Sequence, residues 1–189
     1  MAGLCLPRQI AFAGAACARA RDVFALCHGA TPVSAFDEAL EKLWDGVQHD
    51  DLPAIAAIYR PLTDVPESSC DDTLDRDWLA WLALATFEFP SALISTRLPV
   101  QALTQCSALM LTLMGEIDLR LGWGGAPREG RLASLEWAAQ RSCVSILMAD
   151  PANPEVPVAD LVAAGGELAR TVPGLAAALV AATGWRLNL

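Results

Sequence analysis

Residues 75–95 have the sequence DRDWLAWLALATFEFPSALIS, which is apolar on almost every side of a helix. A helix of this kind belongs in the middle of a bundle, because only neighbouring helices can cover all of its faces. Pro90 predicts a kink, since its ring removes one backbone hydrogen bond. A second apolar helix is predicted directly after it. We therefore expect two central helices, at about 75–95 and 99–121.

Helical periodicity extends outward from these two helices in both directions, and alternating strand patterns are nearly absent. An amphipathic helix follows Ser34, its expected N-cap, with apolar residues on one face and charges on the other. Further helices are predicted at about 7–27, 52–62, 129–149, 158–171 and 173–183. No linker or internal repeat interrupts the pattern. We predict one all-α domain over residues 1–189, a bundle of seven to eight helices.

Composition and charge exclude several classes of protein. Apolar residues make up 54% and charged residues 19%, so the chain is too apolar to be disordered. The formal net charge is −9, from 22 acidic and 13 basic residues, and such a surface repels nucleic acid and anionic membranes. Lys42 is the only lysine among these basic residues, and this bias towards arginine suggests a GC-rich bacterial genome. We expect an acidic bacterial protein with no nucleic acid and no membrane among its partners.

The cysteines predict a reducing compartment. The chain has six of them, scattered along its length: Cys5, Cys17, Cys27, Cys70, Cys106 and Cys143. No CxxC pair occurs, and the two histidines, His28 and His49, do not lie at zinc-ligand spacing. We therefore expect free thiols, no metal, no cofactor and a cytoplasmic protein.

The strong acidity favours a non-enzymatic binding or interaction protein, comparable to immunity proteins or adaptors, that neutralises a basic protein partner. An acidic connector over residues 63–77 would attract such a partner, and a tryptophan in the glycine-rich loop 122–127 would anchor it. The partner-binding candidates are Asp64, Glu67, Asp71, Asp72 and Trp123. The sequence leaves the identity of the partner and homo-oligomerisation open.

The alternative function is a cofactor-free enzyme or ligand-binding protein that holds an apolar small molecule in a tryptophan-lined pocket. The candidate pocket residues are Trp78, Trp81, Glu88, Glu116, Glu136, Trp137 and His28. A structural interpretation competes with each of them. The tryptophans lie at core spacing, Glu116 has Arg120 at i+4, and His28 ends a helix. No catalytic constellation is recognisable, so no catalytic residue is assigned and the question of catalysis stays open.

A third, weaker hypothesis comes from residues 71–75, which spell DDTLD. In all-helical isoprenoid synthases a DDxxD stretch binds magnesium and a diphosphate through carboxylates on one helix face. The chain lacks the second acidic metal motif that this chemistry requires. The competing interpretation is an acidic cap at the start of the helix over 75–95, where negative charge meets the positive end of the helix dipole.

The first predicted helix contains Gln9, Phe12, Ala13, Cys17, Arg19 and Phe24. This pattern gives the chain a resemblance to the YjaG-like family of bacterial all-helical domains of unknown function. Four later stretches add to it: Leu43-Trp44, Asp71-Asp72, Glu136-Trp137 with Gln140, and the ending Ala182–Leu189. The resemblance implies an all-helical fold and a cytosolic bacterial protein. It brings no known active site, so it implies no catalytic residue.

Overall fold

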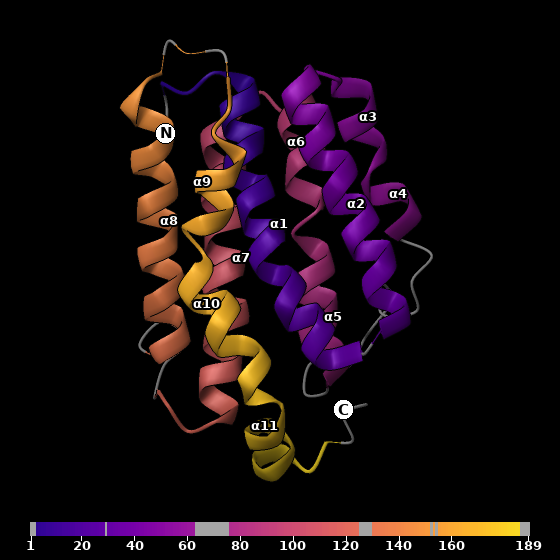
Figure 1. Cartoon of the computed structure of the whole chain (residues 1–189), viewed down its shortest axis with the longest axis vertical. Coiled ribbons are helices and arrows are strands. Elements are labelled where there is room, and N and C mark those ends of the chain that lie inside the picture. The colour runs from indigo at the N-terminus through magenta and orange to yellow at the C-terminus, as the bar shows by residue number, and fades with distance from the viewer. Residues whose placement is uncertain are drawn as a thin grey trace.

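The computed structural model describes residues 3–28, 30–62, 76–124, 130–151, 153 and 155–185. All regular elements in these ranges are helices, and the predicted all-α bundle is confirmed (Figure 1). The elements are α1 (Leu6–His28), α2 (Ala30–His49), α3 (Leu52–Ala57), α4 (Tyr59–Leu62), α5 (Arg76–Ala85), α6 (Glu88–Ser95), α7 (Pro99–Arg120), α8 (Arg131–Ala149), α9 (Val158–Ala163), α10 (Gly166–Thr171), the 3-10 turn η2 (Val172–Leu175) and α11 (Ala176–Thr183).

The helix α1 lies at the centre of the bundle. It contacts α2, α5, α6, α7, α8, α9, α10 and η2, and it crosses Figure 1 between α8 on the left and α2 on the right. Its side chains Ile10, Cys17 and Phe24 are completely buried. The two helices that the sequence placed at the centre, 75–95 and 99–121, pack beside it in the interior. The sequence did not single out α1, because Arg8 and Arg19 lower its apolar content.

The predicted helix 75–95 is divided into α5 and α6 by a turn at Thr86–Phe87. Pro90 has no N–H to donate to the carbonyl of Thr86, and the hydroxyl of Thr86 donates to the carbonyl of Ala83 at 2.7 Å. The predicted kink is confirmed, one turn before the proline. By length and composition the stretch Asp77–Ser95 would pass for a membrane span, but 56% of it is buried inside the fold. The apolar residues of this stretch pack in the core of the bundle.

Three further predicted elements have different bounds in the structure. The helix expected at 158–171 is divided into α9 and α10, with Gly165 in the turn between them. A Cβ atom at Gly165 would lie 2.7 Å from the Cγ of Arg19, so the backbone of this turn packs directly on that buried side chain. The helix expected at 52–62 is divided into α3 and α4. Since α2 already begins at Ala30, the N-cap prediction for Ser34 was wrong.

Candidate functional site

Two hollows of about 500 Å³ each lie between α7 and α8, and both are lined by Trp137 and Arg141. One continues towards the C-terminal half of α8 and is completed by Phe12, Thr104, Ser107, Gln140, Val144 and Ser145. The other continues towards the N-terminal half of α8 and is completed by Leu111, Ala133 and Ser134. We call the two hollows together the α7–α8 groove.

The placement of Trp137 and Arg141 follows from the geometry of α8. Residues four apart lie on the same helix face, so these two side chains project into the groove together. Trp137 is 49% exposed, which makes the prediction of a core position for this tryptophan wrong. Neighbouring helix residues point about 100° apart, and Glu136 accordingly faces the core, where it has no exposed surface.

Three of the hydroxyl groups along the groove are bonded to the protein itself. The hydroxyl of Thr104 donates to the carbonyl of Val100 at 2.8 Å, and that of Ser134 donates to the carbonyl of Gly130 at 2.8 Å. The hydroxyl of Ser107 donates to the side-chain oxygen of Gln140. Because these donors are satisfied, the walls that they form offer a ligand mainly hydrocarbon surface.

A polar network lies beneath the groove. The side-chain nitrogen of Gln140 donates to Glu136 at 2.8 Å, and Glu136 accepts two hydrogen bonds from Arg19 of α1, at 2.8 and 2.9 Å. Burial works against the charge on Arg19, but the Glu136 carboxylate outweighs this effect and raises the pKa of the guanidinium. Arg19 and Glu136 therefore form a charged, bidentate pair in the core.

Three thiols lie near this buried pair. Burial raises the pKa of Cys17 to about 12, raises that of Cys106 well above its ordinary value, and raises that of Cys143. A thiol with a raised pKa holds little thiolate at neutral pH and is a poor nucleophile. In the described part of the chain Cys5, Cys17, Cys106 and Cys143 are free thiols, as predicted, and Cys70 lies outside it.

The structure does not bring the seven pocket candidates together. Trp78 and Trp81 stack on each other on α5, with ring centroids 4.8 Å apart, and both are half-buried. Glu116 forms the expected ion pair with Arg120, at 2.6 Å. Of the other candidates, only Trp137 lines the α7–α8 groove, with Glu136 buried beneath it. Glu88 lies elsewhere on α6, and the side chain of His28 is outside the described residues.

The exposed carboxylate of Glu88 accepts a hydrogen bond from the hydroxyl of Tyr59 at 2.9 Å. Burial, helped by this bond to Glu88, raises the pKa of Tyr59 from its ordinary value of 10.0 to about 12. Because the folded protein then holds this proton more tightly than the unfolded chain does, the contribution to stability is complete below pH 10 and is lost as the pH rises through about 12.

Tyr59 is the only tyrosine, so its ionisation can be followed directly by tyrosinate absorbance. We expect a titration midpoint near pH 12 in the folded protein. Glu88→Gln should lower the midpoint, because it removes the negative charge that opposes ionisation. An unchanged midpoint in this variant would show that Glu88 does not influence the phenol.

Most partner-binding candidates lie outside the described residues. These are Asp64, Glu67, Asp71 and Asp72, together with the complete DDxxD stretch. The fifth candidate, Trp123, follows α7 and is 38% exposed. The guanidinium of Arg131 lies over its ring, 5.7 Å from the centroid.

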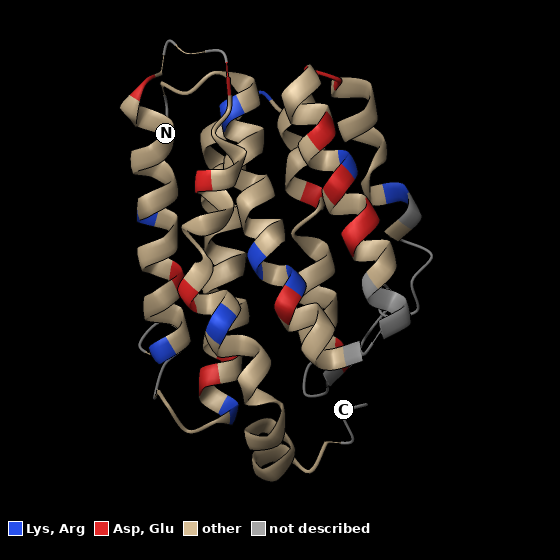
Figure 2. Ribbon diagram, in the orientation of Figure 1, with Lys and Arg blue, Asp and Glu red and all other residues tan. Residues whose placement is uncertain are grey.

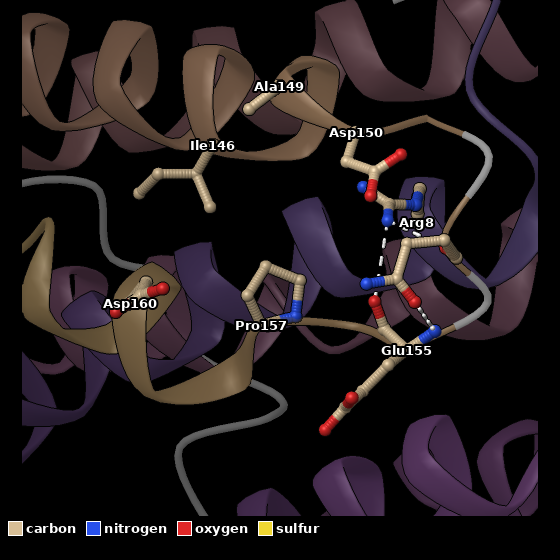
Figure 3. Close-up of a pocket in the computed structure, with 8 residues that line it drawn as sticks. Arg8, Ile146, Ala149, Asp150, Glu155, Pro157 and Asp160 are labelled. Atoms are coloured by element: carbon tan, nitrogen blue, oxygen red, sulfur yellow. Dashed lines mark hydrogen bonds between the residues drawn. The ribbon is translucent and has the colours of Figure 1, made fainter.

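A pocket of about 460 Å³, separate from the α7–α8 groove, lies between the end of α8 and the start of α9 (Figure 3). Arg8, which is almost completely buried, donates to the carbonyls of Leu147 and Asn153 at 2.7 Å each and to that of Glu155 at 3.3 Å. A cation is favourable at the carboxyl end of a helix. Arg8 therefore ties the end of α8 and the following connector to α1. Sequence reasoning missed this role, for which the signal is an arginine directly beside an apolar stripe.

Comparisons with known protein families, characterised proteins and solved structures find no match to this chain. Membership of the YjaG-like family therefore stays a prediction. Within the described residues, no group of three or more histidine, cysteine or acidic side chains is arranged to hold a metal ion. The α7–α8 groove is the candidate site on which a functional proposal can be built.

Proposed function

We propose that this protein is a non-catalytic binding protein that holds an elongated apolar molecule in the α7–α8 groove. The observation that carries the proposal is Trp137, which stands half-exposed between two hollows of ligand size. Ligand pockets commonly enclose about 300–1,000 Å³. Each hollow is within this range, and the two are joined by an aromatic surface.

The shape of the groove supports an elongated ligand. Its lining on α8 runs from Ala133 to Ser145, which at the rise of an α-helix is about 18 Å. Trp137 lies between these ends, where its ring offers a large apolar surface that needs little side-chain ordering on binding. A chain-like molecule can extend from this ring into either hollow.

The chemistry beneath the groove supports binding without catalysis. Glu136 is engaged by Arg19 and Gln140, so it has no free position from which to act as a general base. The nearby thiols are buried and have raised pKa values, which disfavours nucleophilic attack. These groups support the fold of the groove.

The distribution of charge also favours an apolar ligand here. In Figure 2, α2 carries several acidic residues and one lysine, Lys42, whereas α8 is uncharged over most of its length. Among the groove-lining residues there is no carboxylate. The interaction with a basic partner, the cytoplasmic location and homo-oligomerisation stay predictions from the sequence, and the first of them relies mostly on residues outside the described ranges.

Calorimetric titration with decanol, a neutral chain, tests the proposal. We expect saturable binding of decanol to the wild type, and Trp137→Ala should weaken it about tenfold, because the ring surface is lost. Trp123→Ala is the matched control, since it removes an exposed tryptophan that does not line the groove. Equal losses in the two variants, or no binding of any apolar chain, would overturn the proposal.

A further inference from the structure

Arg141 is the only charged side chain among the residues that line the α7–α8 groove, and it lines both hollows. Its side chain is exposed. Of the carboxylates in the described part of the chain, none forms an ion pair with it. In a protein of net charge −9 this leaves an available guanidinium in an otherwise uncharged groove.

Several arginines in the described ranges are engaged by the fold, whereas Arg97 and Arg170, which do not line the groove, share with Arg141 the lack of an ion pair to a described carboxylate. Arg19 binds Glu136, Arg21 binds Asp37, and Arg120 binds Glu116. Arg8 donates hydrogen bonds to backbone carbonyls. Arg141 differs from the engaged arginines because none of the described residues forms an ion pair with it, while Trp137 lies one helical turn away on the same face.

We propose that the ligand of the α7–α8 groove is an amphiphilic carboxylate, with its anionic group on Arg141 and its hydrocarbon chain along Trp137. This inference rests on the proposed function and specifies the class of ligand. A guanidinium is planar and can donate two parallel hydrogen bonds to a carboxylate. The hydrocarbon chain of the ligand lies in the hollow that contains Val144, where the hydroxyls of Thr104 and Ser107 already donate to oxygen atoms of the protein.

Charge argues against two other occupants of the same groove. A cationic amphiphile would place its charge beside Arg141, which repels it. A second copy of the chain, bound groove to groove about a two-fold axis, would bring two Arg141 side chains and two net charges of −9 towards each other. An anionic head group with an apolar chain complements both features of the groove.

Three probes with the same chain separate the inference from the proposed function: decanoate, decanol and decyltrimethylammonium, each titrated calorimetrically below its micelle concentration. We expect the wild type to bind decanoate about tenfold more tightly than decanol, as one charge-assisted contact predicts. Decyltrimethylammonium should bind most weakly. Arg141→Gln should remove the preference for decanoate over decanol, and Arg141→Lys should retain part of the preference.

Arg170→Gln is the matched control, since it makes the same change in net charge on α10, outside the groove. It should keep the full preference for decanoate. Equal binding of decanoate and decanol by the wild type, or loss of the preference in Arg170→Gln as well, would overturn the inference and leave the proposed function standing. If none of the three probes binds, the proposed function fails and the inference fails with it.

Discussion

Glu136→Gln should lower the free energy of unfolding by about 3–5 kcal/mol, the largest effect that we expect from a single substitution in this chain. The new side chain has nearly the same shape, so the change removes charge without opening a cavity. It leaves the buried guanidinium of Arg19 without its counter-charge, and Arg19 is 5% exposed. Urea denaturation followed by far-ultraviolet circular dichroism measures the loss.

The matched control is the double variant Arg19→Met with Glu136→Leu. Replacing a whole buried ion pair by apolar side chains is often neutral, because the cost of desolvating both charges disappears with them. We therefore expect the double variant to be more stable than Glu136→Gln. If Glu136→Gln instead lowers the free energy of unfolding by less than about 1 kcal/mol, the variant does not leave Arg19 as an uncompensated buried charge.

Local sequence patterns predicted the helices because the apolar residues of each helix recur at helical spacing. The bounds of α7 and α8 agree with the predicted 99–121 and 129–149 to within two residues. The internal breaks were harder to predict. The backbone of the turn at Gly165 packs on Arg19, and no local sequence pattern reveals a contact between residues so far apart in the chain.

The candidate site was predicted only in part, for a similar reason. Glu136 and Trp137 were both identified from the sequence, but they face opposite environments. The partner of Glu136 lies on α1, separated from it by 117 residues, and periodicity within α8 does not reveal it. Arg141 was not among the site residues predicted from the sequence. Its importance depends on the absence of a carboxylate from the groove, which only the packing of α7 against α8 determines.

Asp118→Ala should lower the free energy of unfolding by about 2–3 kcal/mol, the second largest expected effect. The helix α8 begins after Gly130, which occupies the N-cap position but has no side chain to cap with. Asp118 of α7 takes over this role from a neighbouring helix. Its two carboxylate oxygens accept hydrogen bonds from the backbone N–H groups of Leu132 and Ala133, at 3.0 and 2.9 Å.

Burial makes this cap costly to lose. Asp118 is 1% exposed, so water cannot easily replace it at the two N–H groups. Asp118→Asn keeps a single carbonyl oxygen and should cost about half as much, because it can accept from only one of the two donors. Denaturation curves of the two variants and the wild type, all measured at one pH, give the order of their stabilities. Equal stability of Asp118→Ala and the wild type would mean that the first turn of α8 does not depend on this carboxylate.

Gly130 provides an independent test of the same contact. Its backbone is extended, a conformation that any residue adopts, so the need for glycine here is steric. A Cβ atom at this position would lie 2.1 Å from a carboxylate oxygen of Asp118. Gly130→Ala should therefore push Asp118 away from α8 and lose the same two hydrogen bonds. Because the two substitutions remove one shared interaction, the double variant should lose clearly less stability than the sum of the single variants. Additive losses would instead place the two residues in separate interactions.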